Sequence, residues 1–404
     1  MLHQSIILSA FQTSMLFVSR VALLKQQQLW AKALPMVKPY YAVKSNNDPI
    51  LLSWIQKAGL KVDCASPGEM KACLKAGFHK TDILYANTMK ATVDLKEAID
   101  LGVGVTTTDS VEGVEQMAGS SSGSKMSIIV RLAVSDSTSR CPFSIKFGAK
   151  QQEWWPIVKA IQRNGLNFGG VSFHVGSGAS DPDVFKSAIR TCRQFQNQMG
   201  LELPLVDIGG GFLPSPKPFL AAAKGIVEEI DDWEYYGTGP KEWIAEPGRF
   251  FSSPVQTLIC PVVFKKKSHG LIRYTLDESL YGQFSSIVYD HAKPAFTVDT
   301  GDRELVPTDG KSLFFGKTCD SLDLLFAQEG GPEYEVGDFF VFPYMGAYTS
   351  ASATTFNGFA LPKRIYLESD DLIRNQHRMF QEVGDVSGVE YPIETKSKIS
   401  LSLA

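Results

Sequence analysis

The alternation of apolar and polar positions divides the chain into two regions of different texture. Up to about residue 254, short apolar or β-branched runs alternate with longer stretches whose apolar residues recur at i, i+3 and i+4. The short runs predict eight strands, at residues 39–44, 61–65, 83–86, 103–108, 127–134, 169–175, 203–208 and 243–245. The longer stretches predict helices, among them residues 49–58, 67–76, 93–100, 152–163 and 182–199. This order predicts an α/β fold, a (β/α)8 barrel rather than an open doubly wound sheet.

Beyond residue 254 the pattern predicts a separate β-domain. Its apolar runs are short, at residues 256–265, 272–276, 339–342 and 364–367, with turn residues at His269, Gly270 and Gly310. Because 404 residues exceed what one core usually supports, we expect two domains. We assign residues 20–254 to the barrel, and residues 255–404 with residues 1–19 to a sandwich-like or barrel-like β-domain. The polar residues 370–404 are expected to be loosely ordered.

Composition narrows the class of protein. Hydrophobic residues at 44% and charged residues at 21% are ordinary for a globular protein, and a net charge of -3 indicates neither a nucleic-acid nor a membrane partner. The apolar stretch 6–11 is too short to span a bilayer and makes a poor signal peptide. The basic run 265–267 predicts a solvated hairpin loop.

The six cysteines are scattered, without a CxxC pair. This spacing argues against a disulfide framework or a zinc site and favours a reducing compartment. We therefore expect a cytoplasmic protein.

Polar residues stand at the C-terminal ends of the predicted strands, where a (β/α)8 barrel places its active site. In order they are Lys44, Asp63, Arg131, His174, the glycines 209–211, and Glu246 with Arg249. A charged residue that closes an apolar strand is costly unless it has a partner. These strand ends therefore predict one site.

Each strand-end residue has a structural and a functional interpretation. Lys44 is either a charge leaving a strand for solvent or an amine that attacks an aldehyde to form a Schiff base. His174 is either a hydrogen-bonded core residue or a flat side chain that stacks on a cofactor ring. Three successive glycines expose backbone N–H groups to an anion, and Arg249 offers a charge-assisted fork to the same phosphate. Glu246 beside a phosphate site needs a cation, and a protonated pyridine nitrogen would be that cation. Together these residues specify pyridoxal phosphate.

Several motifs resemble the eukaryotic-type ornithine decarboxylases, which belong to the alanine-racemase-like fold type of pyridoxal enzymes. The resemblance covers residues 17–359 and is carried by PYYAVKSNND, DCAS, GVSFHVGSG, DIGGGF, AEPGRF, YDHA, CDSLD and MGAYTSASATTFNGF. It implies decarboxylation of L-ornithine to putrescine, the first step of polyamine synthesis. Alanine racemases place an arginine on the ring nitrogen, and Glu246 argues against that activity.

The resemblance implies a role for each matching residue. Lys44 would carry the cofactor, with Asp63, Glu69 and Arg131 near it and His174 stacked on the ring. The phosphate would be held by Ser177, Gly209, Gly210, Gly211, Arg249 and Tyr348, and the ring nitrogen by Glu246. Cys319 would reprotonate Cα, and the substrate would be bound by Tyr289, Asp290, Asp320 and Phe356.

The same resemblance implies a homodimer with shared active sites. Cys319 and Asp320 would come from the second subunit. Lys146 and Asp323 would form an intersubunit ion pair, with Tyr281 and Gly346 also at the interface.

Three positions depart from the family pattern, and other activities stay open. Ser45 stands in place of cysteine, Lys317 in place of proline, and Ser321 in place of glycine or alanine. The last two flank Cys319, where they could alter substrate reach. Lysine, bifunctional ornithine/lysine or arginine decarboxylation are the alternatives among enzymes. A non-catalytic regulator that sequesters an inhibitory protein is the alternative outside them.

Overall fold

A computed structural model describes residues 12–120, 126–368 and 389–390. The chain forms two compact units. The barrel unit comprises Leu23–Phe251, and the β unit comprises Met1–Ala22 with Ser252–Ala404. The expectations for residues 6–11 and for most of residues 370–404 lie outside the described residues.

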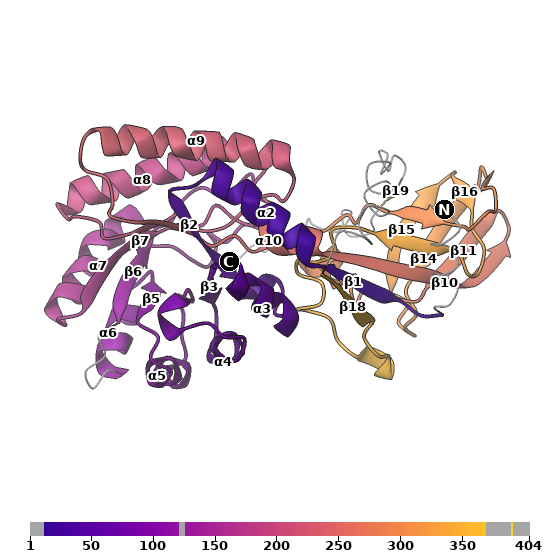
Figure 1. Cartoon of the computed structure of the whole chain (residues 1–404), viewed down its shortest axis with the longest axis horizontal. Helices are drawn as coiled ribbons and strands as arrows, with labels where there is room; N and C mark the ends of the chain where they lie inside the picture. The colour runs from indigo at the N-terminus through magenta and orange to yellow at the C-terminus, as the bar shows by residue number, and fades with distance from the viewer. Residues whose placement is uncertain (1–11, 121–125, 369–388, 391–404) are drawn as a thin grey trace, which may run out of the picture. The chain divides into compact units, whose positions relative to one another are not determined.

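The barrel unit contains a closed ring of eight parallel strands, which confirms the predicted barrel (Figure 1). The strands are β2 (Val37–Ala42), β3 (Lys61–Cys64), β4 (Ile83–Tyr85), β5 (Val105–Thr108), β6 (Ser127–Arg131), β7 (Asn167–Ser172), β8 (Val206–Asp207) and β9 (Trp243–Ala245). Each strand pairs in parallel with the next, and β9 closes the ring on β2.

Helices surround the ring in the order that a (β/α)8 barrel requires (Figure 1). They are α2 (Arg20–Ala33), α3 (Pro49–Lys57), α4 (Pro67–Lys75), α5 (Thr92–Asp100), α6 (Val111–Ser120), α7 (Gln151–Arg163), α8 (Asp183–Met199), α9 (Pro216–Tyr235) and the short α10 (Arg249–Ser252). Two of these helices begin with an N-cap residue of a type that favours this position. Asp48 accepts hydrogen bonds from two backbone N–H groups of α3, Ser66 accepts one from α4, and a proline follows each cap.

A layer of apolar side chains fills the barrel interior. Tyr40, Leu84, Ile129 and Ile244 come from β2, β4, β6 and β9 and are buried together. Such a layer makes the interior a packed core rather than a pore. Polar groups at the C-terminal strand ends therefore lie above a closed apolar floor.

The β unit is built on one mixed sheet, which in the described part of the chain has nine strands. The order is β12-β17-β10-β11-β14-β15-β19, and β1 pairs with both β10 and β18. The strands are β1 (Met15–Ser19), β10 (Gln256–Ser268), β11 (Leu271–Leu276), β12 (Thr297–Asp299), β14 (Lys311–Phe315), β15 (Leu324–Glu329), β17 (Phe339–Phe342), β18 (Lys363–Leu367) and β19 (Val389–Glu390). A second, two-stranded sheet pairs β13 (Val306–Pro307) with β16 (Pro332–Glu333). The unit also contains the short helix α11 (Ser285–Tyr289).

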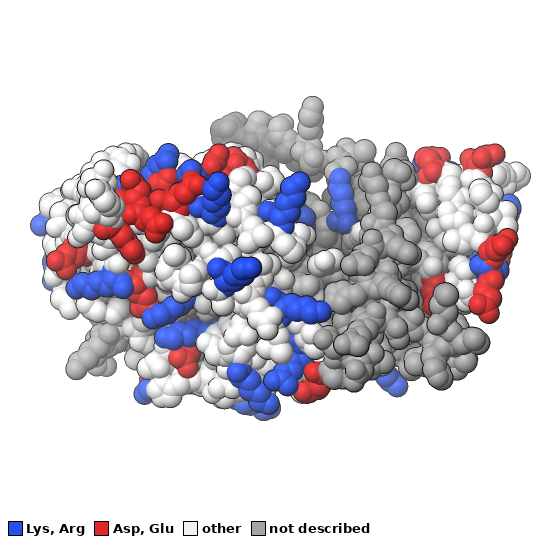
Figure 2. Space-filling model, turned by 45° about the horizontal axis from the view of Figure 1, so that its top comes forward, with Lys and Arg blue, Asp and Glu red and all other residues white. Residues whose placement is uncertain are grey.

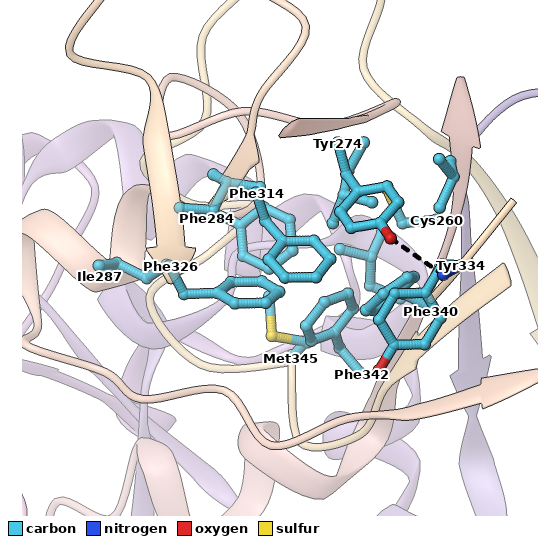
Figure 3. Close-up of a cluster of buried hydrophobic side chains, with 14 of the residues drawn as sticks. Cys260, Tyr274, Phe284, Ile287, Phe314, Phe326, Tyr334, Phe340, Phe342 and Met345 are labelled. Carbon is cyan, nitrogen blue, oxygen red and sulfur yellow. Dashed lines mark hydrogen bonds between the residues drawn. The ribbon is translucent and has the colours of Figure 1, made fainter. Parts of the chain in front are cut away.

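Aromatic side chains dominate the core of the β unit (Figure 3). Phe314 stacks on Tyr274 and on Phe326, with ring centroids 4.9 and 4.4 Å apart. The buried hydroxyl of Tyr274 accepts a hydrogen bond from the backbone N–H of Tyr334 at 3.0 Å. This hydrogen bond offsets the cost of burying the hydroxyl. Stacked rings of this kind bury large apolar areas in a small unit.

One local prediction is wrong. Lys265, Lys266 and Lys267 lie inside β10, paired with β11, and the turn comes later at His269 and Gly270. The strand continues through the basic run, where Glu333 forms ion pairs with Lys265 and Lys267 at 2.7 and 3.0 Å. These ion pairs offset the repulsion between the lysines.

Ion pairs also connect the barrel's outer helices. Lys186, Arg190 and Arg193 of α8 pair with acidic residues of α9. Figure 2 shows acidic and basic side chains interspersed over this surface. Among the described residues, no helix is both long enough and apolar enough to cross a membrane.

Candidate active site

Lys44 lies just past the C-terminal end of β2, in the short 3-10 helix η1 (Val43–Ser45). Its Nζ is 3.0 Å from Oδ2 of Asp63, and the Asp63 side chain is buried whereas that of Lys44 is 38% exposed. The buried hydroxyl of Ser45 donates to the carbonyl oxygen of Ala42 at 2.8 Å and stabilises the turn. The departure at Ser45 therefore leaves the turn intact. Lys44 is a reachable amine held against a buried carboxylate.

Three buried carboxyl groups gather at this end of the barrel: Asp63, Asp207 and Glu246. Burial raises the pKa of Glu246 well above its ordinary value, and the other two carboxylates raise it further. Burial also raises the pKa of Asp207, although the N–H of Gly209 stabilises its anion. Oδ1 of Asp63 accepts no hydrogen bond within the described residues. The cluster therefore favours a bound cation.

Two further residues complete the surroundings of this cluster. Arg131 ends β6, and burial lowers the pKa of its guanidinium, while Glu246 opposes that shift. Its charge lies over the ring of Phe147, 4.9 Å from the centroid. Glu69, on α4, accepts the backbone N–H of Ala65 at 2.7 Å, and burial raises its pKa. Arg131 was expected from the strand-end pattern and Glu69 from the resemblance alone, and their contact with a cofactor stays a prediction.

The glycine loop follows β8. Gly209 has φ +63°, and a Cβ there would collide with the carbonyl oxygen of Phe173, so only glycine fits. The expectation that all three N–H groups face an anion is wrong for Gly209. Its N–H donates to Oδ1 of Asp207 at 2.8 Å, because that carboxylate lies two residues earlier and folds back onto the loop. Within the described residues the N–H groups of Gly210 and Gly211 make no hydrogen bond, so these two donors could bind an anion.

A guanidinium and a hydroxyl lie beside this loop. Ser177 follows β7, in a segment whose Ala179 donates its N–H to the carbonyl oxygen of Gly211 at 3.1 Å. Nη2 of Arg249 donates to Oγ of Ser177 at 2.8 Å, and both side chains are buried. A buried guanidinium, a hydroxyl and two backbone N–H groups form a suitable cradle for a phosphate.

His174 presents a neutral ring to the site. Its Nδ1 accepts the N–H of Gly176 at 3.0 Å, which leaves the ring proton on Nε2. Burial lowers the pKa of His174 well below its ordinary value, and the charges of Arg131 and Lys44 lower it further. The edge of Phe143 packs against it, with centroids 4.9 Å apart. A flat, uncharged ring of this kind can stack on a cofactor.

The residues expected to contact substrate belong to the β unit. Asp290 follows α11 directly and is buried, whereas the preceding Tyr289 is 73% exposed. Tyr348 lies in the same unit with φ +57°. Gly346 packs so tightly that a Cβ would collide with the carbonyl oxygen of Ser252.

Four of these predicted residues are brought together. The hydroxyl of Tyr281 donates to the Asp320 carboxylate, and its ring stacks on Phe356 with centroids 4.1 Å apart. The N–H of Leu322 and the Tyr281 hydroxyl lower the pKa of Asp320. Cys319, the next residue, is exposed. An exposed thiol therefore lies beside an anionic carboxylate and two aromatic rings.

The expected ion pair between Lys146 and Asp323 of a second subunit stays a prediction. Asp323 is fully buried, and its two carboxylate oxygens accept the N–H of Leu280 at 2.8 Å and both the N–H and the hydroxyl of Thr318 at 3.1 and 2.6 Å. Lys146 lies over the ring of Phe147, 5.0 Å from the centroid. Within one chain, the Asp323 carboxylate connects Thr318 of its own loop to Leu280.

Two buried ionisable residues near the strand ends escaped the sequence prediction. Asp207 closes the apolar strand two residues before Gly209, which is the same signal that selected Lys44. Lys90 stands in a loop, where periodicity gives no signal. It is buried, it donates to the carbonyl oxygen of Thr107 at the C-terminal end of β5, and burial lowers its pKa to about 7.

Comparisons with known proteins agree with this geometry. The family described as "Pyridoxal-dependent decarboxylase, pyridoxal binding domain" matches residues 20–253. Ornithine decarboxylase of Caenorhabditis elegans is 33% identical over 89% of this chain and 88% of that protein. The agmatine-bound arginine decarboxylase of Paramecium bursaria Chlorella virus superposes with a TM-score of 0.82 at 31% identity, covering 89% of this chain and 98% of that one. The cadaverine-bound lysine/ornithine decarboxylase of Vibrio vulnificus gives 0.78 at 29% identity, covering 89% and 96%.

The residues present fit pyridoxal phosphate. The carboxylate cluster with the unpartnered Asp63 oxygen suits a cationic ring, and the donors of Gly210, Gly211 and Ser177 suit its phosphate. Lys44 is a half-buried amine that would bind its aldehyde. The chain belongs to the pyridoxal-dependent decarboxylase family, with pyridoxal phosphate as its cofactor.

Proposed function

We propose that this chain decarboxylates L-ornithine to putrescine and carbon dioxide, the first step of polyamine synthesis. One observation carries the proposal: the amine of Lys44 stands 3.0 Å from Asp63 at the strand ends of a barrel, beside the buried carboxyl group of Glu246, whose pKa is raised. The similarity to ornithine decarboxylases over most of the chain supports this choice of substrate.

In this proposal the barrel's residues hold and tune the cofactor. Lys44 binds it covalently, and Asp63 keeps the amine oriented. Glu246 holds a proton on the ring nitrogen. Gly210, Gly211 and the buried Arg249–Ser177 pair bind the phosphate, and His174 covers one face of the ring. The protonated ring supplies an electron sink for the electron pair left at Cα when carbon dioxide departs.

Residues of the β unit would choose the substrate and return the proton. Cys319 donates a proton to Cα, since its thiol is exposed whereas the other described cysteines are buried or half-buried. Asp290 and Asp320 hold the distal ammonium of the substrate. Two carboxylates suit a compact ammonium, whereas a planar guanidinium requires a fork. Ornithine and lysine satisfy this condition, and arginine does not.

A substrate panel tests the choice among these amino acids. One methylene of mismatch is worth about 1–3 kcal/mol, or about 10–200-fold. We therefore expect kcat/KM for ornithine to exceed that for lysine by at least about tenfold, with arginine nearly inert. Asp290→Ala should raise KM strongly because the ammonium loses a partner. Equal kcat/KM for lysine and ornithine, or a preference for arginine, would contradict this substrate assignment.

The working unit in this proposal is a homodimer whose sites combine the barrel residues of one subunit with Cys319 and Asp320 of the other. Mixing Lys44→Ala with Cys319→Ala protein should restore part of the activity, because some heterodimers regain one complete site. Two inactive variants that never complement, although subunits exchange, would place the whole site within one chain.

Two alternatives are less well supported. A bifunctional ornithine/lysine activity is favoured by the similarity to the Vibrio vulnificus enzyme. A non-catalytic regulator is disfavoured because Lys44, Asp63, Arg131, Glu246 and Cys319 are all present. We also propose a cytoplasmic location, which the absence of disulfides among the six cysteines supports.

A further inference from the structure

The loop of residues 316–323, here called the Cys319 loop, joins β14 to β15. Lys317 lies two residues before Cys319, at a position where the resembled family usually has proline. Its backbone N–H donates to the carbonyl oxygen of Glu278 at 3.0 Å. Proline has no such donor, so this chain holds the loop with a hydrogen bond that a proline would remove.

The Lys317 side chain adds a second attachment. Its Nζ is 3.2 Å from Oδ1 of Asp277, and both side chains are only 15% exposed. The Asp277 carboxylate is itself fixed, since Oδ2 accepts the backbone N–H of Ser14 at 2.6 Å. The ammonium also lies 5.3 Å from the centroid of the Phe359 ring. A partly buried ion pair with a cation–π contact restricts the lysine more than an exposed pair would.

These contacts connect the Cys319 loop to the segment that carries Phe356. The N–H of Cys319 donates to Oδ1 of Asn357 at 3.0 Å, and Lys317 contacts Phe359 in the same segment. Phe356 stacks on Tyr281, whose hydroxyl holds Asp320. The thiol, the Asp320 carboxylate and the Phe356 ring are therefore held in one arrangement that includes Lys317.

We propose that Lys317 is a positioning residue, which through Asp277 and Phe359 fixes Cys319 and Asp320 and so sets the chain length of the accepted diamino acid. This inference rests on the proposed function. A loosened loop lets Cys319 and Asp320 move relative to Phe356. The shorter substrate then loses its tight fit, and the longer one gains room.

The variants Lys317→Met and Asp277→Asn each remove the ion pair, and Lys317→Arg retains the charge. Lys311→Met is the matched control, because Lys311 lies on β14, which leads into the same loop, and its ion pair with Glu329 is exposed. For each variant, kcat and KM are measured with ornithine and with lysine. The rate of Cys319 alkylation by iodoacetamide is measured by peptide mapping, which does not depend on activity.

We expect Lys317→Met and Asp277→Asn to lower the ornithine-to-lysine ratio of kcat/KM by about tenfold, with the loss of ornithine activity mainly in kcat. Alkylation of Cys319 should become several times faster. Lys317→Arg and Lys311→Met should retain the ratio and the alkylation rate.

An unchanged ratio and an unchanged alkylation rate in both ion-pair variants, with an active parent enzyme, would overturn the role of Lys317. A parent protein inactive on every diamino acid would instead overturn the proposed function. In that case the alkylation rates still decide whether Lys317 positions the loop. If Lys317→Met fails to fold, Asp277→Asn removes the same pair from the other side.

Discussion

The buried carboxylates of the two units differ in their neighbours, although burial acts on them alike. In the β unit, Glu278 accepts two backbone N–H groups, and burial nevertheless raises its pKa to about 7. Asp323 accepts three hydrogen bonds, two from Thr318 in its own loop and one from the N–H of Leu280. In the barrel unit, Glu246 faces two other carboxyl groups, and Asp63 leaves one oxygen without a partner.

This difference separates a structural carboxylate from a functional one. The direction of the pKa shift is the same for Glu278 and Glu246, so the shift alone does not distinguish them. The partners do. The fold surrounds Glu278 and Asp323 with donors, whereas it places Glu246 beside the carboxyl groups of Asp207 and Asp63, an arrangement that a bound cation would stabilise.

The largest expected effect is the loss of activity in Glu246→Gln. We expect kcat with ornithine to fall by about 10²–10³-fold, because a neutral amide does not stabilise a protonated, positively charged ring nitrogen. The cofactor-free variant should be at least as stable as the parent in thermal denaturation, since a buried like-charge contact is removed. Glu228→Gln, on an exposed helix surface, is the control with unchanged activity. Activity within tenfold of the parent would show that Glu246 does not act on the ring.

A substitution among the structural carboxylates of the β unit should act on stability. Asp323→Ala leaves the N–H groups of Leu280 and Thr318 without acceptors, and we expect the free energy of unfolding to fall by about 1–3 kcal/mol per buried group. Asp320→Ala, three residues away and outside the core, should change it by less than about 1 kcal/mol in denaturant titrations. Equal effects of the two substitutions would contradict the structural role of Asp323.

The smallest effect concerns pH. Because the pKa of Glu278 is raised from 4.5 to about 7 in the folded protein, the folded state binds more protons than the unfolded state between these values. Its contribution to stability is therefore fully present below pH 4.5 and is lost as pH rises to about 7. Glu278→Gln should flatten the fall in unfolding free energy across this window. An identical pH profile in the variant would show that Glu278 is not protonated in the fold.

The barrel and most of its strand-end residues could be predicted because the signal is local. An apolar run closed by a charged residue is visible at Lys44 and Glu246, and barrel geometry then brings such ends together. Loop contacts could not be predicted in this way. The N–H of Gly209 bonds to Asp207, and the ammonium of Lys317 meets Asp277, which is 40 residues away in the sequence.

The length of a strand was also hard to predict where charged residues indicate a turn but the backbone continues to pair with the next strand. The three lysines at 265–267 carry the pattern of a solvated turn, yet β10 continues through them. The acceptors that allow this come from Glu333, in a distant strand. Only tertiary structure supplies that partner.

The identity of the cofactor-bearing lysine tests the central claim most directly. Purified protein loaded with pyridoxal phosphate is reduced with borohydride and mapped by peptide mass spectrometry. We expect the pyridoxyl group on Lys44 alone, because its amine is exposed and held beside Asp63. Lys90 is the internal competitor, a buried lysine near the same strand ends whose pKa is lowered to about 7. A label on Lys90, or on any lysine other than Lys44, would contradict the assignment of the site.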